Sequence, residues 1–184
     1  MNTSPAHPVV AVVGSARLQS VEQGRMAEAL GDALMKASFR LVTGGLGGVM
    51  QAVSKGARES AAWVDGRIIG VVPSYGHDEA NPYCDIVIPT GAQVGRNLLV
   101  VATGHVVIAM GGGAGTLSEM ALAWQLRRPV IALGDLGWAG KLAGEGLDHR
   151  HDTVIHAANT VDDAIRLCGE LWHTNIGIDG IRAH

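Results

Sequence analysis

Short hydrophobic runs alternate along the chain with longer segments in which hydrophobic residues recur every three or four positions. The runs are typical of buried β-strands, and the longer segments are typical of amphipathic helices. Within most of the runs, hydrophobic residues, mainly Val and Ile, follow one another without polar interruption, which predicts strands buried on both faces. The expected strands lie at 9–13, 39–42, 68–72, 86–88, 105–110, 130–133 and 153–155.

The segments between these strands predict helices. Ser20 and Gln23 have the spacing of a capping box at the start of the first helix. The segment 93–103 is hydrophobic on most sides, so we expect it to be buried. The expected helices lie at 20–37, 49–60, 93–103, 117–124, 138–146 and 160–172, of which 138–146 is weakened by its glycines.

Alternation of strands and helices favours parallel strands. We therefore expect an α/β fold, with one doubly wound, mainly parallel sheet of about seven strands and helices on both faces. The expected domain spans residues 9–173, between a flexible N-terminal segment at 1–8 and a C-terminal tail at 174–184. Ligands of such sheets bind beyond the carboxyl ends of the strands, near the point where strand order reverses.

Composition excludes several classes of protein. The net charge is −3 and no cluster of Lys and Arg occurs, which argues against nucleic-acid binding. No hydrophobic run reaches the roughly 20 residues that cross a bilayer, and the polar N-terminus does not resemble a signal peptide. The two cysteines, Cys84 and Cys168, are too few for a disulfide scaffold. We expect a cytoplasmic protein that binds neither membranes nor nucleic acid.

Glycine is unusually abundant, at 26 of 184 residues, and it gathers where strands end. Three strand ends carry such segments: Gly14-Ser15-Ala16-Arg17, Thr43-Gly44-Gly45-Leu46-Gly47-Gly48-Val49-Met50 and Gly111-Gly112-Gly113-Ala114-Gly115-Thr116. Glycine lets backbone N–H groups approach a ligand closely, and a following helix N-terminus attracts anions. The loops therefore predict a small phosphate-bearing ligand, whereas the alternative is that they merely form tight turns.

Two well-known phosphate motifs are missing. The chain has no GxxxxGK[ST] sequence, which argues against P-loop nucleotide hydrolysis. The first strand-to-helix turn has no GxGxxG, which argues against the usual dinucleotide-binding mode.

Three charged side chains near these loops have two interpretations each. Thr116 and Glu119 have the spacing of a capping box, but Glu119 is also placed to act as a general acid or base, or to bind a ribose hydroxyl. Arg96, next to Asn97 at the start of a hydrophobic segment, needs either an anionic ligand or a salt bridge. Arg17 follows the first loop in the same way.

Two polar segments remain ambiguous. The sequence Asp148-His149-Arg150-His151-Asp152 contains metal-ligating residue types, but a solvated loop is the favoured interpretation and we predict no metal site. The segment 75–83 is either a lid over the ligand or a plain surface loop. Trp124 and Trp172 are expected in the core or in a subunit interface.

Four motifs together resemble a known superfamily: Gly14-Ser15-x-Arg17, the segment 43–50, Gly95-Arg96-Asn97 and the segment 111–119. It contains the "lonely guy" cytokinin-activating phosphoribohydrolases, once misannotated as lysine decarboxylases, and the molybdenum cofactor carrier proteins. The resemblance spans about residues 9–172. It implies a Rossmann-like fold and a homodimer or homotetramer.

In the hydrolases of this superfamily, an arginine and a Pro-Gly-Gly-x-Gly-Thr-x-x-Glu motif cleave the N-glycosidic bond of nucleoside 5′-monophosphates. Arg96 and Glu119 match these catalytic positions, and the segment 112–116 matches the phosphate loop. Gly111 replaces the first proline of the motif, and Asn97 replaces a lysine. These departures, together with the segment 81–83, resemble the carrier branch, whose members hold molybdenum cofactor without chemistry.

The sequence therefore predicts a binding protein for a phosphate-bearing pterin or nucleotide-like ligand, most simply a molybdenum cofactor carrier that needs no cofactor for chemistry. The alternative is a phosphoribohydrolase in which Arg96 and Glu119 are catalytic. Lysine decarboxylation is rejected, because none of the three lysines has a suggestive setting. The candidate ligand-binding residues are Gly14, Ser15, Arg17, Thr43, Gly44, Gly45, Gly47, Gly48, Met50, Arg96, Asn97, Gly111, Gly112, Gly113, Ala114, Gly115, Thr116 and Glu119.

Overall fold

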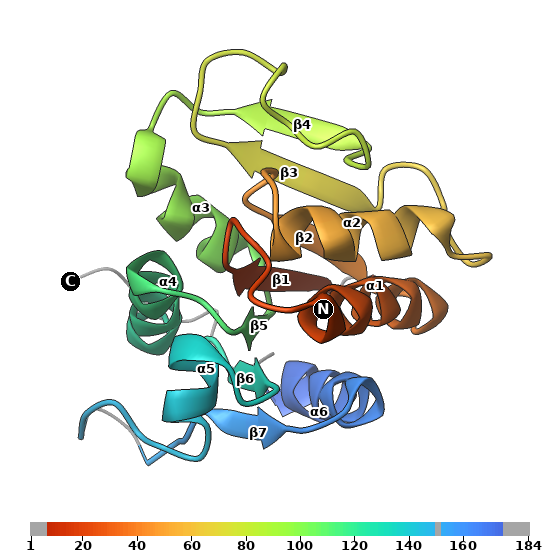
Figure 1. Cartoon of the computed structure of the whole chain (residues 1–184). Helices are drawn as coiled ribbons and strands as arrows, with labels where there is room; N and C mark the ends of the chain where they lie inside the picture. The colour runs from red at the N-terminus through yellow and green to blue at the C-terminus, as the bar shows by residue number, and fades with distance from the viewer. Residues whose placement is uncertain (1–6, 150–151, 175–184) are drawn as a thin grey trace, which may run out of the picture.

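Seven parallel strands form one sheet in the order β4-β3-β2-β1-β5-β6-β7 (Figure 1). The computed structural model describes residues 7–149 and 152–174. The strands are β1 (Val9–Gly14), β2 (Arg40–Thr43), β3 (Ile68–Val72), β4 (Ile86–Pro89), β5 (Val106–Met110), β6 (Val130–Leu133) and β7 (His156–Ala158). The predicted Rossmann-like α/β fold is thus confirmed.

Helices cover both faces of the sheet. They are α1 (Val21–Lys36), α2 (Val49–Glu59), α3 (Arg96–Thr103), α4 (Ala114–Gln125), α5 (Gly137–Leu142) and α6 (Val161–Thr174), with a short 3₁₀ turn at Gln93–Gly95 before α3. One hydrophobic cluster lies between the sheet and α1, α2 and α6, and a second lies between the sheet and α3, α4 and α5. Strand order reverses between β1 and β5, and the helices that follow these two strands cover opposite faces. A ligand-binding crevice is expected at this position.

Helices α1 and α2 contact each other through glycine backbone. A Cβ atom built on Gly56 would lie 1.8 Å from the carbonyl oxygen of Glu28, and one on Gly31 would lie 2.1 Å from that of Val53. Real Cβ atoms do not approach backbone atoms so closely, so only glycine permits this spacing of the two helices.

The predicted cap of α1 is confirmed. The backbone N–H of Gln23 donates to the Ser20 hydroxyl at 3.0 Å. The Gln23 side-chain oxygen accepts from the backbone N–H of Gln19 at 2.8 Å, one residue before the position that a capping box uses. Gln23 thereby ties the loop after β1 to the first turn of α1.

The last strand is not where the sequence predicted it. Residues 153–155 were expected to form it, but β7 is His156–Ala158, which pairs with β6. The N–H of Ile155 donates to the carbonyl of Glu145, and the N–H of Gly144 donates to the carbonyl of Ile155. Pairing with this returning segment outweighs the strand preference of Thr-Val-Ile, because strand preference depends strongly on tertiary context.

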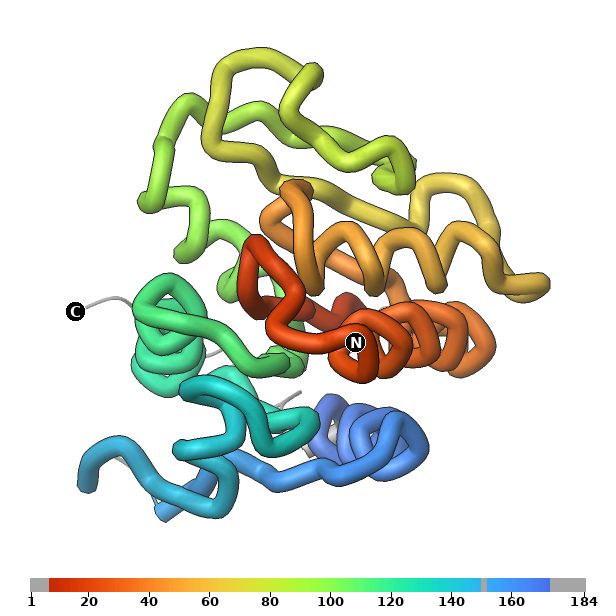
Figure 2. The backbone as a smooth tube through the Cα atoms, in the orientation of Figure 1, coloured from red at the N-terminus to blue at the C-terminus, as the bar shows by residue number. Residues whose placement is uncertain are grey.

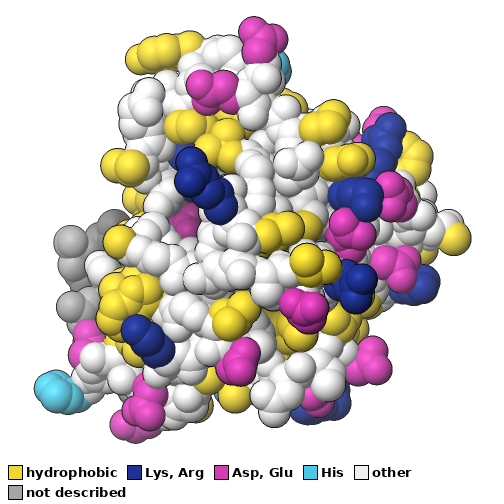
Figure 3. All heavy atoms as spheres, viewed as in Figure 1, with side chains coloured by type: hydrophobic (Ala, Val, Ile, Leu, Met, Phe, Trp, Pro, Cys, Tyr) yellow, Lys and Arg dark blue, Asp and Glu magenta, His cyan; other side chains and the backbone are white. Residues whose placement is uncertain are grey.

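The predicted burial of segment 93–103 is wrong for one side of α3. Arg96, Val100 and Val101 are buried, whereas Leu98 and Leu99 are 43% and 45% exposed. Only one side of α3 faces the sheet within this chain. Hydrophobic side chains are also visible on the space-filled surface over the region of α3 and β4 (Figure 3).

The remaining expectations concern two tryptophans, a cysteine, the chain ends, the segment 148–152 and membrane helices. Trp124 and Trp172 are buried, as is the thiol of Cys168. Arg150 and His151 lie outside the described residues, as do the segments 1–6 and 175–184. The described part of the chain contains no cluster of residues suited to hold a metal ion. None of its helices is both long enough and hydrophobic enough to cross a membrane.

Candidate functional site

The three glycine-bearing loops meet at one edge of the sheet, because β2, β1 and β5 are neighbours. The N–H of Val49 donates to the carbonyl of Ser15 at 3.0 Å, which joins the loops after β1 and β2 (Figure 2). Gly48 is packed so tightly there that a Cβ would lie 2.2 Å from the Ser15 oxygen. A Cβ on Gly14 would lie 2.8 Å from the carbonyl oxygen of Met110 at the end of β5. The loops therefore form one continuous surface at the reversal point.

The loop after β2 is held rigidly by polar contacts. The Thr43 hydroxyl accepts from the N–H of Gly45 at 3.0 Å, so this hydroxyl stabilises the turn itself. Buried Asn81 donates its side-chain amide to the carbonyls of Gly45 and Leu46, both at 3.1 Å. Sequence reasoning placed Asn81 in an ambiguous polar loop and used the segment 81–83 for the resemblance to the carrier branch, but it did not count Asn81 among the site residues.

Arg96 and Glu119 form the centre of the candidate site. Arg96 begins α3 and Glu119 lies in α4, and Nη1 of the guanidinium is 3.4 Å from Oε1 of the carboxyl group. Both residues are more than nine-tenths buried. A Cβ on Gly44 would lie 2.6 Å from the guanidinium and 2.8 Å from the sulfur of Met50. The fold thus brings together four residues that the sequence singled out.

Burial shapes the electrostatics of this pair. It raises the pKa of Glu119 to about 7, an effect that the positive charge of Arg96 opposes. Burial also lowers the pKa of Arg96, and there the charge of Glu119 acts in the other direction. Near neutral pH the Glu119 carboxyl group is able either to give or to take a proton. The Arg96 Nε is buried without a hydrogen-bond partner, so a donor remains available for a ligand.

The predicted capping box of Thr116 and Glu119 is wrong. Helix α4 begins earlier, at Ala114, with Gly113 as its N-cap residue and no side-chain cap. Thr116 is instead buried in the first turn, where a Cβ on Gly112 would lie 2.2 Å from its hydroxyl. The glycine loop winds into the helix before Thr116 is reached, because Gly111 and Gly112 adopt positive φ angles of 62° and 90°.

The start of α4 is anchored on one side and open on the other. The N–H groups of Ala139 and Trp138 in α5 donate to the carbonyls of Gly111 and Gly112 at 3.0 and 3.1 Å. Space around Gly113 and Gly115 is open, because a Cβ on either would meet no atom of the described residues within 4 Å apart from its own stretch of backbone. The first N–H groups of a helix have no intrahelical acceptor, so this uncapped turn has the donors that suit an anion.

Asn97 connects the starts of α3 and α4. Its carbonyl oxygen accepts from the guanidinium of Arg96, and its amide nitrogen lies 3.5 Å from the hydroxyl of Ser118. That hydroxyl in turn donates to the carbonyl of Gly115 at 2.7 Å. Arg17 is placed elsewhere: it is exposed and lines a groove of about 420 Å³ beside α2, which contains neither Arg96 nor Glu119.

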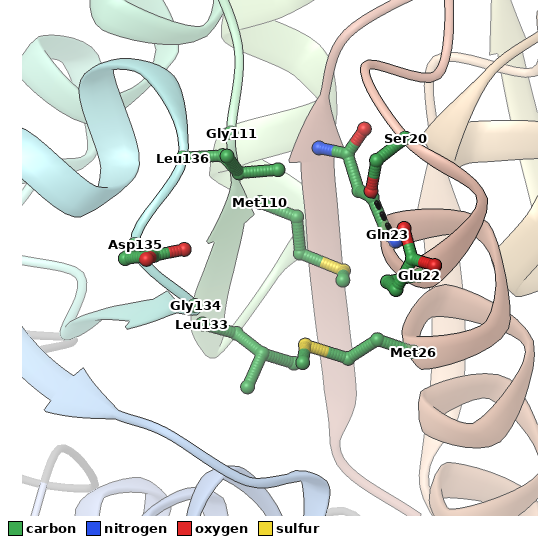
Figure 4. A pocket seen from close by; sticks show the side chains of 10 residues that line it. All are labelled: Ser20, Glu22, Gln23, Met26, Met110, Gly111, Leu133, Gly134, Asp135 and Leu136. Atoms are coloured by element: carbon green, nitrogen blue, oxygen red, sulfur yellow. Dashed lines mark hydrogen bonds between the residues drawn. The ribbon is translucent and has the colours of Figure 1, made fainter.

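A smaller cavity of about 180 Å³ opens on the other side of the loop that leads to α4 (Figure 4). Gly111 and Gln23 line it. Sequence reasoning missed this cavity, because Gln23 was interpreted as a capping residue and the methionines around it as core.

Three comparisons place the chain among known proteins. A model of the SLOG cluster4 family matches residues 7–165. An uncharacterized protein of Archaeoglobus fulgidus is 33% identical over 124 residues, which cover 67% of this chain and 78% of that protein.

Two solved structures are similar over almost the whole chain. The molybdenum cofactor binding protein of the phototrophic bacterium Rippkaea orientalis has a TM-score of 0.79 and 31% identity, covering 91% of this chain and 98% of its own. The molybdenum cofactor carrier protein of Chlamydomonas reinhardtii has a TM-score of 0.76 and 32% identity, covering 91% and 99%. These findings confirm the superfamily that the four motifs predicted, and the protein is a member of the SLOG cluster4 family.

Proposed function

We propose that the protein binds molybdenum cofactor and holds it without chemical change. The observation that carries this proposal is its similarity, at 31% and 32% identity over 91% of the chain, to two proteins described as binding or carrying that cofactor. The uncapped first turn of α4 supports it, because the cofactor carries a phosphate group and the turn is suited to one.

Each part of the site has a role in this proposal. The N–H groups of the segment 113–116 bind the phosphate, with the helix dipole contributing about 0.3–1 kcal/mol. The buried Nε of Arg96 donates to an oxygen of the same ligand. Glu119 balances the guanidinium charge when the site is empty. Asn97 and Asn81 hold the surrounding loops in place.

The direct test is protection of the cofactor. Purified protein is mixed with molybdenum cofactor released from a molybdoenzyme, and the mixture is later assayed for its ability to activate an apo-molybdoenzyme. We expect activating capacity to survive longer than it does with albumin at equal concentration. Failure to protect the cofactor, combined with good binding of unrelated nucleotides, would contradict the proposal.

A phosphoribohydrolase is the second candidate, and one observation favours it. The pKa of Glu119 near 7 suits a general acid or base, and Arg96 contacts the same carboxyl group. This candidate predicts release of free base from AMP or a modified AMP. Glu119→Gln should abolish turnover while leaving nucleotide binding intact. Absence of turnover across a panel of nucleoside monophosphates counts against it.

We also propose a homo-oligomer, most simply a homodimer or homotetramer in the cytoplasm. Exposed hydrophobic side chains concentrate on α3, on β4 and on the segments beside them: Tyr75, Ile86, Ile88, Val94, Leu98 and Leu99. Exposed hydrophobic side chains gathered in one region are typical of a protein interface. The two free cysteines are typical of a reducing compartment. Light scattering of wild-type protein and Leu99→Asp tests the interface, with a smaller mass expected for the variant.

A further inference from the structure

A second cavity adjoins the phosphate-binding turn. It measures about 180 Å³ and lies beyond the ends of β5 and β6, beside the first two turns of α1. Figure 4 shows its lining: Ser20, Glu22, Gln23 and Met26 from α1 and its cap, Met110 and Gly111 from β5 and its loop, and Leu133, Gly134, Asp135 and Leu136 from β6 and its loop. Gly111 also begins the segment that leads to the uncapped turn of α4.

Gln23 supplies an unpaired donor to this cavity. The residue is 5% exposed, and its side-chain oxygen accepts from the N–H of Gln19 at 2.8 Å. That bond fixes the orientation of the amide and leaves Nε2 buried without a hydrogen-bond partner in the described part of the chain. Figure 4 shows Nε2 on the side that faces Met110 and Gly111. Because an unpaired buried donor costs about 1–3 kcal/mol, the arrangement points to a ligand that supplies the acceptor.

The walls of the cavity suit a flat ring. Four hydrophobic side chains line the cavity: Met26, Met110, Leu133 and Leu136 (Figure 4). Methionine packs favourably against aromatic rings, because its sulfur is polarisable and its chain is flexible. This feature matters in a chain of few aromatic residues, since no aromatic side chain lines the cavity to stack on a ring.

The charges at the cavity exclude a phosphate and favour hydrogen-bond donors. Among the described residues that line it, Glu22 and Asp135 are charged, both are exposed carboxylates, and no Lys or Arg accompanies them. Carboxylates repel anionic groups and accept hydrogen bonds from N–H groups, often two at a time. The cavity therefore offers the Gln23 amide donor, the Ser20 hydroxyl and two carboxylate acceptors around a hydrophobic slot.

We propose that this cavity binds the ring end of the ligand, and that the ring carries a 2-amino-4-oxopyrimidine edge, as a pterin and a guanine both do. The ring carbonyl accepts from Gln23 Nε2. The amino group on the same ring edge donates to the carboxylate of Asp135. The proposal rests on the proposed function for the phosphate end only, which the turn of α4 binds beyond Gly111.

Ring probes test this edge on the wild-type protein. Pterin is compared with lumazine, which has an oxygen in place of the 2-amino group, and GMP is compared with IMP and AMP. We expect pterin to bind at least about tenfold more tightly than lumazine, because loss of a donor to a carboxylate leaves that group unpaired. A pterin ligand is indicated if only pterin and lumazine differ in affinity. A guanine ligand is indicated if GMP binds more tightly than both IMP and AMP. Equal binding within both sets overturns the proposal.

Two substitutions test the residues, with pterin fluorescence as the readout. Gln23→Glu keeps an oxygen that accepts from Gln19, but it replaces the Nε2 donor with a second carboxylate oxygen and adds a negative charge, so pterin affinity should fall at least about tenfold. Asp135→Asn should lower the affinity for pterin and leave the affinity for lumazine unchanged. Gln125→Glu and Asp65→Asn, on exposed residues away from the cavity, are the matched controls. Unchanged pterin affinity in both Gln23→Glu and Asp135→Asn, with melting temperatures close to wild type, overturns the proposal.

The outcomes separate this inference from the proposed function. If the protein protects molybdenum cofactor but Gln23→Glu protects it equally well, the ring lies elsewhere and the carrier function stands. If pterin binds in a Gln23-dependent way but the cofactor is not protected, the ring cavity stands and the carrier function fails.

Discussion

Glycine has opposite uses at the contact of α1 with α2 and at the start of α4. At the contact, Gly31 and Gly56 lie against backbone carbonyls, and a Cβ on either would come within about 2 Å of an oxygen. At the start of α4, Gly113 and Gly115 have no atom within 4 Å of the position where a Cβ would lie. The first pair brings two helices together, whereas the second pair leaves room.

Substitutions in the first pair of glycines should therefore affect stability, and substitutions in the second pair should affect ligand binding. A side chain at the α1–α2 contact must push two helices apart, which disturbs the larger hydrophobic cluster beneath them. A side chain at the start of α4 touches nothing in the protein, so its cost falls on whatever binds there. The buried pair Arg96–Glu119 lies beside this open turn and adds a second cost to stability, since burial disfavours the charged forms of both groups.

The largest expected effect is that of Gly56→Ala. Its Cβ would lie 1.8 Å from the carbonyl oxygen of Glu28, so we expect the free energy of unfolding to fall by at least about 3 kcal/mol. Urea denaturation measures this. Gly169→Ala in α6, where a Cβ meets nothing within 4 Å, is the control and should gain up to about 1 kcal/mol. Equal stability of both variants would show that the close packing of Gly56 against α1 has no measurable effect on stability.

The next largest effect is the pH dependence of stability that Glu119 causes. Its pKa is raised from 4.5 to about 7 in the folded protein, so folding favours the protonated form. The resulting stability is fully present below about pH 4.5 and is lost as pH rises through 7. Relative to Glu119→Gln, the wild-type protein should lose about 3 kcal/mol across this range.

Thermal or urea unfolding at several pH values measures this difference. Glu145→Gln, on an exposed residue, is the control and should follow the wild-type profile. A constant difference between wild type and Glu119→Gln from pH 5 to 8 contradicts the raised pKa.

A smaller effect isolates backbone conformation from packing. Gly66 has a φ of +81° in the turn before β3, with nothing within 4 Å of its Cβ position. Gly66→Ala should therefore lose about 1 kcal/mol through conformational strain alone. Gly66→Asn should recover part of the loss, because asparagine tolerates this conformation better. Identical melting temperatures for all three proteins would show that positive φ has no measurable cost here.

The smallest effect on stability is expected from Gly115→Ala, and the largest on binding. The residue lies in the first turn of α4 with open space around it, so alanine should leave stability unchanged or raise it by up to about 1 kcal/mol. Its methyl group would project toward the bound phosphate, so affinity for molybdenum cofactor should fall at least about tenfold. Wild-type affinity in this variant would show that the phosphate binds elsewhere.

Much of the fold was predictable because local patterns and tertiary structure agree. Continuous hydrophobic runs mark six of the strands, and Ser20 marks the start of α1. Failures occur where another part of the chain decides the outcome. Residues 153–155 have strand-forming side chains but pair with the segment at 144–145. The hydrophobic residues of α3 predicted burial, yet Leu98 and Leu99 are exposed in this chain.

In the candidate site too, short motifs predicted some residues, whereas the contacts between them depend on the fold. The sequence identified Arg96 and Glu119, and the fold brings them within 3.4 Å. The spacing of Thr116 and Glu119 predicted a cap, but α4 begins two residues before Thr116. Neither Gln23 nor Asn81 was predicted to belong to the site, since a single amide in a cap or a loop carries no signal of what it faces.

The sequence by itself therefore determined the parallel sheet, the edge at which the glycine loops gather and the superfamily, because these depend on hydrophobic periodicity and on short motifs. Tertiary structure decided which glycines are packed and which are free, which way the Gln23 amide donates, and how far burial raises the pKa of Glu119. Each of these depends on atoms from distant segments, whose positions are set by packing and not by neighbours in the chain.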